Sequence, residues 1–248
     1  SFLKFRAGYS QVAGGAGSPY ALSLSYGIYG QGHLGASLGN ISGNRIPNSE
    51  ITPFEKNETE FGMDLRLFDN KLSIDATYYD NETVGDIVGV SASATSGYNS
   101  ALANLGEISN KGIELLVKGT IMQTADFAWN ATLNYTNNES KVVATNDTGG
   151  NISMDEPRSR NLRVTHIVGE KYGALYGSSF VRDTNGAIVH EMVNGIPIPK
   201  VGPRKILGFG VAPTQLGIGS NFRYKDFDAG FLIEGKMGGK IYSGYNAY

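Results

Sequence analysis

Side chains that commonly carry enzyme chemistry are scarce in this sequence. It contains no cysteine, and its only histidines are His33, His166 and His190. Nucleophilic thiols and cysteine-based zinc sites are therefore excluded. No HxxxH spacing or carboxylate cluster accompanies the histidines, so we interpret them as surface residues of loops and not as members of a metal site or a catalytic triad. The sequence predicts no enzyme, no catalytic residue, no metal site and no cofactor.

Two short motifs resemble ligand sites but lack the residues that such sites need. The segment 183–186 reads DTNG, like the start of a calcium-binding loop, but Asn194 stands where that loop requires its bidentate glutamate. A hairpin turn within VRDTNGAIV accounts for it. The glycines near the C-terminal end do not form a dinucleotide-binding fingerprint; they are Gly208, Gly210, Gly217 and Gly219.

The chemistry that remains is noncovalent binding by polar side chains at alternating positions. In several segments a charged or amide residue recurs at every second position. Alternate residues of a β-strand share one face, so these side chains are expected to line a common polar surface. The candidates for contact with a substrate are Asp64, Arg66, Asp75, Glu114, Asn130, Asn134, Asn221, Arg223 and Asp228.

Seven segments with this alternation must position those side chains. The first places Leu3, Phe5 and Ala7 on one face and Lys4 and Arg6 on the other. Leu116 and Leu232 are apolar residues on otherwise polar faces. The pattern predicts an all-β fold of antiparallel strands near residues 2–11, 57–68, 71–84, 108–119, 126–139, 214–224 and 227–241.

The connections between these segments alternate in length. Short turns are expected at 69–70, 120–126 and 225–226, whereas 12–52, 88–105 and 142–212 are long. Outer-membrane barrels have short periplasmic turns and long extracellular loops. The pattern therefore predicts a transmembrane β-barrel with long extracellular loops. A soluble or surface-attached β-sandwich that serves as a binding or adhesin module, with the same apolar faces packed together, remains the alternative.

Composition agrees with a membrane barrel and excludes other classes. The net charge is −2 and no basic stripe is present, so nucleic acid is not an expected partner. No apolar run is long enough for a transmembrane helix, which needs about 18 residues. Aromatic residues flank the short turns, as in the interfacial girdles of barrels; they are Phe68, Phe127, Trp129, Tyr224 and Phe227.

Several stretches resemble the barrel of SusC-like TonB-dependent transporters of Bacteroidetes. They follow one another in the family's order: FLKFRAGYSQVA, FEKNETEFGMDLRLFDNKLSIDATYYDNET, ISNKGIELLVKGT, FAWNATLNYTNNESKV, YGSSFVRDTNGAIV and FRYKDFDAGFLIEGKMGGKIYSG. The resemblance implies that residues 1–248 form part of a barrel of about 22 strands, without its plug and its last strands. It also implies an outer-membrane location in a Gram-negative bacterium.

The same resemblance implies a function and partners. The family imports nutrients actively, driven by TonB acting on an N-terminal plug that is not in this chain. A SusD-like surface lipoprotein usually captures the glycan or peptide oligomer. The expected partners are therefore this lipoprotein, TonB, the lipid of the outer membrane and an oligosaccharide or peptide substrate.

Overall fold

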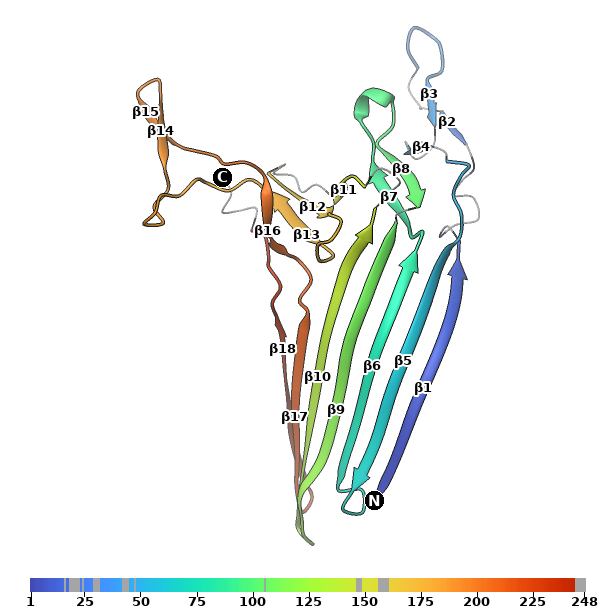
Figure 1. The fold of residues 1–248 in the computed structure, drawn as a ribbon, viewed down its shortest axis with the longest axis vertical. Helices are drawn as coiled ribbons and strands as arrows, with labels where there is room; N and C mark the ends of the chain where they lie inside the picture. The colour runs from blue at the N-terminus through green and yellow to red at the C-terminus, as the bar shows by residue number, and fades with distance from the viewer. Residues whose placement is uncertain are drawn as a thin grey trace.

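A long antiparallel sheet dominates the structure, a computed structural model (Figure 1). It describes residues 1–243 apart from 16, 18–22, 24, 29–31, 42–44, 47, 105, 146–148 and 156–160. Each strand of the sheet pairs with its neighbours in the order β1-β5-β6-β9-β10-β17-β18. The strands are β1 (Phe2–Gly14), β5 (Phe54–Leu67), β6 (Leu72–Val84), β9 (Glu107–Gln123), β10 (Phe127–Ala144), β17 (Thr214–Tyr224) and β18 (Phe227–Met237).

One face of this sheet is apolar from edge to edge. The strand register aligns one apolar residue from every strand in a single row: Leu3, Leu65, Ile74, Val117, Leu133, Ile218 and Ile233. The adjoining row carries Phe5, Met63, Ala76, Leu115, Tyr135 and Leu216. We call this side the apolar face and the opposite side the polar face.

The apolar face is not covered by any described part of the chain. Phe61, Ile113 and Ile218 belong to interior strands, yet their exposed fractions are 56%, 50% and 45%. The buried hydrophobic residues are Val142, Leu162, Ala174 and Leu175, and none of them lies on this face. A β-sandwich requires the apolar faces of two sheets to pack together. The sandwich interpretation is therefore wrong, and the sheet forms a single layer.

Short turns join neighbouring strands at one end of the sheet (Figure 1). Between β5 and β6, Leu67 pairs with Leu72, and Phe68, Asp69 and Asn70 all have positive φ angles. Asn and Asp adopt this left-handed conformation more readily than most residues. At the β17–β18 turn Tyr224 pairs with Phe227, so only two residues turn the chain.

Aromatic side chains gather near these turns on the apolar face. The rings of Trp129 and Phe222 stack with centroids 5.6 Å apart. The indole Nε1 of Trp129 donates a hydrogen bond to Ser220 Oγ at 2.8 Å. A partly exposed apolar ring with one satisfied polar atom is suited to the boundary between hydrocarbon and water.

Several predicted strand boundaries differ from the structure. β1 continues to Gly14 instead of residue 11, β5 begins at Phe54 instead of residue 57, and β10 continues to Ala144 instead of residue 139. The predicted turn 120–126 is shorter, because β9 continues to Gln123 by way of a bulge that leaves Ile121 unpaired. The last strand was expected to reach residue 241 but ends at Met237. Gly238 has a φ of 88° there, and Lys240 then donates its backbone N–H to the Phe209 carbonyl.

The long connections lie at the other end of the sheet and contain their own short strands (Figure 1). The first holds β2 (Tyr26–Ile28), β3 (Gly39–Ile41) and β4 (Arg45–Ile46). The second holds β7 (Ile87–Ser91), the 3-10 turn η2 (Ala94–Ser96) and β8 (Ser100–Asn104), and β8 pairs with both β7 and β4.

The third connection is a small folded unit. Four of its strands form a sheet in the order β11 (Ile152–Asp155), β12 (Leu162–His166), β13 (Ala174–Gly177) and β16 (Lys205–Phe209). Leu162, Ala174 and Leu175 are buried within it. A projecting hairpin is made by β14 (His190–Val193) and β15 (Ile196–Pro199). The predicted turn at VRDTNGAIV is confirmed, since Arg182 bridges Ile188 and Asp183 N–H donates to the Ala187 carbonyl at 2.9 Å.

No helix in the described residues is long and apolar enough to cross a membrane.

Charge substitutions on the two faces test the assignment of the apolar face to lipid. We expect Leu133→Arg or Leu65→Arg to lower the free energy of unfolding by about 2–4 kcal/mol, because either places a cation in hydrocarbon near the middle of the strand. The control is Thr132→Arg, which puts the same charge on the polar face. The measurement is urea unfolding of the complete protein in lipid vesicles. Equal costs for Leu133→Arg and Thr132→Arg would contradict the assignment.

Candidate functional site

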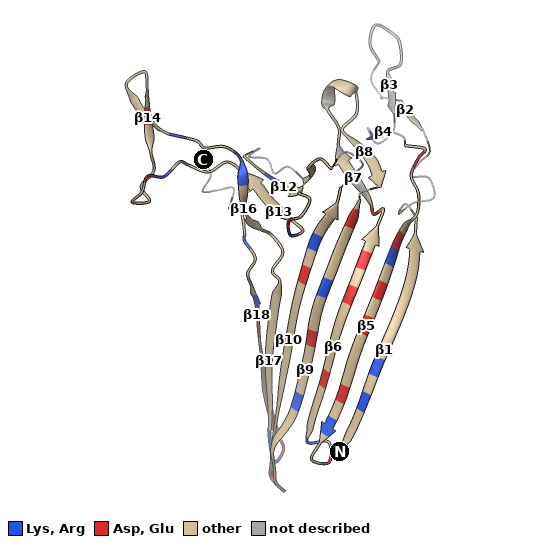
Figure 2. Cartoon of the chain, in the orientation of Figure 1, with Lys and Arg blue, Asp and Glu red and all other residues tan. Residues whose placement is uncertain are grey.

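The polar face holds all nine residues predicted from the sequence. One row crosses the sheet from Lys4 through Asp64 and Asp75 to Leu116 and Asn134. Leu116, the apolar exception, is thus flanked by an aspartate and an asparagine. Charged residues are most numerous on β5 and β9 (Figure 2). The shared face is confirmed, but a role of these residues in substrate contact stays a prediction.

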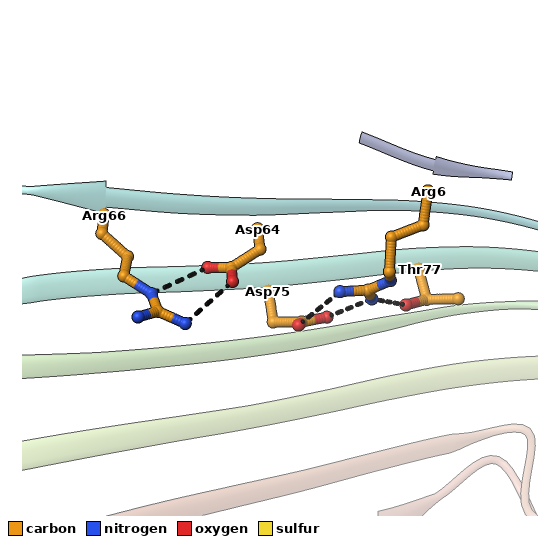
Figure 3. Close-up of polar contacts among 5 residues, drawn as sticks. All are labelled: Arg6, Asp64, Arg66, Asp75 and Thr77. Carbon is orange, nitrogen blue, oxygen red and sulfur yellow. Dashed lines mark hydrogen bonds and ion pairs between the residues drawn. The ribbon is translucent and has the colours of Figure 1, made fainter. Parts of the chain in front are cut away.

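The side chain of Arg6 links β1 to β6 across the intervening strand β5. Its guanidinium donates to both carboxylate oxygens of Asp75, at 2.9 and 2.8 Å, and to Thr77 Oγ1 at 3.0 Å (Figure 3). The side chain reaches β6 by passing over Gly62, its directly paired residue on β5. A Cβ at position 62 would lie 2.6 Å from Arg6 Nε. The missing side chain of Gly62 therefore opens the path for Arg6.

A second arginine pair lies beside the first (Figure 3). Arg66 donates to Asp64 two residues earlier on β5, with its terminal nitrogen 3.0 Å from Oδ2 and its Nε 3.3 Å from Oδ1. Its guanidinium carbon lies 5.3 Å from the centroid of the Phe2 ring. Partly exposed pairs of this kind stabilise a fold little. Their main effect is to fix where the charges of Asp64 and Asp75 lie.

Tyr79 makes a similar crossing nearer the long connections. Its hydroxyl donates to Asn138 Oδ1 at 3.0 Å, two strands away, and its ring lies over Gly112 of the intervening strand β9. The network continues from Asn138 to Ser140 and from Ser140 to Asn110. Sequence reasoning missed Arg6 and Tyr79 as parts of the site. The signal that could have found each of them is a glycine paired with it on the next strand, which leaves room for a long side chain to cross. This pairing can be recognised only once the strand register is known.

The remaining candidates lie toward the short turns. Asn130 Oδ1 accepts a hydrogen bond from Thr120 Oγ1 at 2.8 Å, and Asn221 is paired directly with Asn130 across the sheet. Arg223 Nε donates to Asp228 Oδ1 at 2.9 Å next to the β17–β18 turn. The structure therefore divides the nine residues into separate groups instead of one cluster.

A hollow of about 390 Å³ lies on the polar face and brings three of the candidates together. Asp75, Glu114 and Asn134 line it. Its other polar lining residues are Thr77, Thr136, Gln215, Glu234 and Lys236. Carboxylates, amides and hydroxyls together accept and donate hydrogen bonds, so the hollow suits a polar ligand. The described residues contain no group of three or more His, Asp or Glu that could hold a metal ion.

The expectation that all three histidines are on the surface is wrong for His166. His166 in β12 is only 2% exposed, and its ring lies 4.5 Å from the Tyr172 ring. Its Nε2 is buried without a hydrogen-bond partner among the described residues. Burial lowers the pKa of His166, and the negative charge of Asp86 partly opposes this. His33 and His190 are exposed.

A single antiparallel sheet with an uncovered apolar face, a polar opposite face, and short turns at one end only is the wall of a transmembrane β-barrel. In a membrane, only helices and closed barrels satisfy every backbone polar group. The chain belongs to the TonB-dependent receptor-like β-barrel family, whose sequence model matches residues 2–231. It is an outer-membrane protein, and the predicted resemblance is confirmed.

Curated relatives and solved structures agree with this family. The chain is 26% identical to TonB-dependent receptor P3 of Formosa agariphila over 264 residues, which cover 96% of the chain and 26% of that receptor. It is 25% identical over 207 residues to the TonB-dependent receptor SusC of Bacteroides thetaiotaomicron, covering 78% of the chain and 20% of SusC.

A structure of the RagAB peptide transporter superimposes with a TM-score of 0.75 at 17% identity, over 95% of the chain and 26% of the RagAB chain. At this identity the likeness shows the fold. The chain spans about a quarter of the length of curated relatives such as TonB-dependent receptor P3.

Two glycines of the polar face allow a matched test of the Tyr79 crossing. We expect Gly112→Ala to destabilise the protein by about 1–3 kcal/mol, because overpacking strains the fold and the new Cβ would meet Tyr79 and lie 2.7 Å from the Asn137 carbonyl oxygen. Gly8→Ala is the control, since a Cβ there has no neighbour within 4 Å. The measurement is the free energy of unfolding of the complete protein. Equal effects at positions 8 and 112 would refute the crossing.

The buried histidine predicts that the third connection loosens in acid. A base whose pKa is lowered by folding binds its proton more readily when unfolded, so stability is full above its ordinary pKa of about 6.5 and declines as pH falls below that value. We expect amides of β12 and β13 to exchange faster, after correction for intrinsic rates, at about pH 5.5 than at about pH 7.5. His166→Phe should remove this difference, and His190→Ala should keep it. A difference that survives His166→Phe would rule out His166 as its source.

Proposed function

We propose that this chain forms part of the wall and the extracellular loops of a TonB-dependent importer of nutrient oligomers, either glycans or peptides. Its role is selective, noncovalent binding along the transport path, without bond making. The gating movement belongs to a plug outside this chain on which TonB acts. A SusD-like surface lipoprotein is the proposed partner at the extracellular side.

The observation that carries this proposal is the division of the sheet into two chemically opposite faces. Lipid-facing rows hold the wall in the membrane, while the polar face presents the hollow of Asp75, Glu114 and Asn134 to the barrel interior. A polar oligomer that crosses the membrane needs hydrogen-bonding groups to replace its water. Such groups are present along the polar face. The row of the apolar face that runs from Leu3 to Ile233 contains none.

The relatives support the choice of cargo and partner. RagAB is described as a peptide transporter, and SusC as a TonB-dependent receptor. The third connection has a core of its own, so it can hold a fixed shape at the mouth of the barrel, where binding residues tend to be carried on loops held by a rigid scaffold. All nine polar candidates are proposed to face the interior, and the three in the hollow are the ones proposed to touch cargo.

The proposed import is tested in cells that carry the complete protein. A Bacteroidetes strain is supplied with a tryptic digest of casein and with mixed host and plant oligosaccharides, and depletion of each component from the medium is followed by mass spectrometry. We expect a defined set of oligomers to be depleted only when the gene and an intact TonB are both present. Depletion that is unchanged by loss of the gene or of TonB would overturn the proposal.

The hollow itself predicts a contrast between neighbouring residues. We expect Asn134→Trp to fill the hollow and to weaken uptake about tenfold, which corresponds to about 1.4 kcal/mol of lost binding. Leu133→Trp places the same side chain on the lipid side, away from the hollow, and should leave uptake unchanged. Both variants are compared at equal abundance in the outer membrane. Unchanged uptake by Asn134→Trp would remove the hollow from the transport path.

A further inference from the structure

A groove of about 1110 Å³ lies in the third connection, beside the residues that lead into and out of its projecting hairpin. The hairpin is continued toward the sheet by a ladder in which Phe180 bridges Val201 and the backbone N–H of Val181 donates to the Lys200 carbonyl at 2.9 Å. We call residues 180–201 the arm. The groove lies between the base of the arm, the residues just after β13, the start of β12, the beginning of β16 and Tyr242.

Much of the groove is lined by apolar side chains that remain open to solvent. Phe180 is 48% exposed and Val201 is 59% exposed. The other apolar lining residues are Leu162, Val181, Pro203, Ile206 and Leu207. Apolar side chains gathered in a concave surface mark a site for a ligand with apolar groups. The volume exceeds the roughly 300–1000 Å³ of small-molecule pockets, so a segment of an oligomer fits it better than a small metabolite.

The charges of the groove have one sign. Arg182 and Lys205 line it, and none of the described residues that line it is acidic. Neither cation forms an ion pair with a carboxylate of the described residues. Arg182 gives one hydrogen bond to the Gly186 carbonyl at 2.7 Å, which leaves its other donors available. Two available cations beside an apolar surface attract a carboxylate that is joined to apolar groups.

We propose that this arm groove binds a peptide segment in which a carboxylate side chain lies next to an apolar one. The proposal deepens the proposed function and rests on it for the source of the peptide. Valine, isoleucine, leucine and phenylalanine side chains match the apolar side chains of a peptide. An oligosaccharide would place several hydroxyls against them without partners, at a cost for each unpaired group. Lys205 and Arg182 select the acid, and Phe180 with Val201 selects its apolar neighbour.

The test measures binding of two labelled octapeptides to the complete transporter in detergent. The first repeats Ala-Leu-Asp-Val, and the second replaces each Asp with Asn. We expect the acidic peptide to bind about tenfold more tightly. Lys205→Gln should remove most of this preference, and Lys205→Arg should retain it. Lys225→Gln is the matched control, because it removes a cation from the short turn at the opposite end of the sheet.

Three results would overturn the inference. They are equal binding of the two peptides, a loss of preference in Lys225→Gln as large as in Lys205→Gln, or tighter binding of an oligogalacturonate of similar length that depends on Lys205. Folding of each variant is verified by the heat-dependent gel mobility of the barrel, and Arg182→Gln repeats the test if Lys205→Gln does not fold. If the two peptides bind equally but nutrients are still depleted in a TonB-dependent way, the groove proposal is rejected and the proposed function stands. Absence of such depletion would reject the proposed function instead.

Discussion

The pairing of every backbone N–H and C=O group within hydrocarbon is the constraint on which this structure depends. An unpaired peptide group in lipid costs several kcal/mol, so each strand must stay paired along its length. The five interior strands meet this requirement on both sides, and the edge strands β1 and β18 meet it on one side, in one continuous antiparallel sheet. Continuous pairing then fixes the register, and the register gathers alternate residues into rows. The apolar row from Leu3 to Ile233 and the polar face behind it are two results of the same pairing.

The polar face shows how side chains interact across strands that the ladder holds at fixed spacing. Arg6 and Tyr79 each reach past a neighbouring strand, and each passes over a glycine, Gly62 or Gly112. These crossings tie β1 to β6 and β6 to β10 without help from a packed core. The interactions also orient Asp75 and Asn138, so the polar face has a defined pattern of donors and acceptors. Because one face of the wall contacts lipid, the positions of the polar side chains on the opposite face depend on such contacts between strands.

Much of the sheet was predictable from the sequence, because alternation over many residues is a strong signal and lipid and water impose it on every strand. Contacts between side chains were not predictable, since the partnership of Arg6 with Asp75 depends on register and on Gly62. The third connection was expected as a long loop with one hairpin turn, and its four-stranded sheet was not predicted. Its strands are too short to show alternation, which is why the burial of His166 in β12 was missed. The end of β18 was misplaced because Gly238 turns the chain where the pattern continues.

Accessibility measured residue by residue along β10 tests the central claim, that this sheet separates lipid from a water-filled interior. The chain has no cysteine. A single cysteine introduced at any of positions 131–135 is therefore the one thiol of this chain that a maleimide can label. They are labelled in intact outer membranes with a lipid-soluble maleimide and with a charged, water-soluble one. The account predicts that Ala131→Cys, Leu133→Cys and Tyr135→Cys react with the lipid-soluble reagent, and Thr132→Cys and Asn134→Cys with the charged one. Equal reaction of all five with the charged reagent would contradict it.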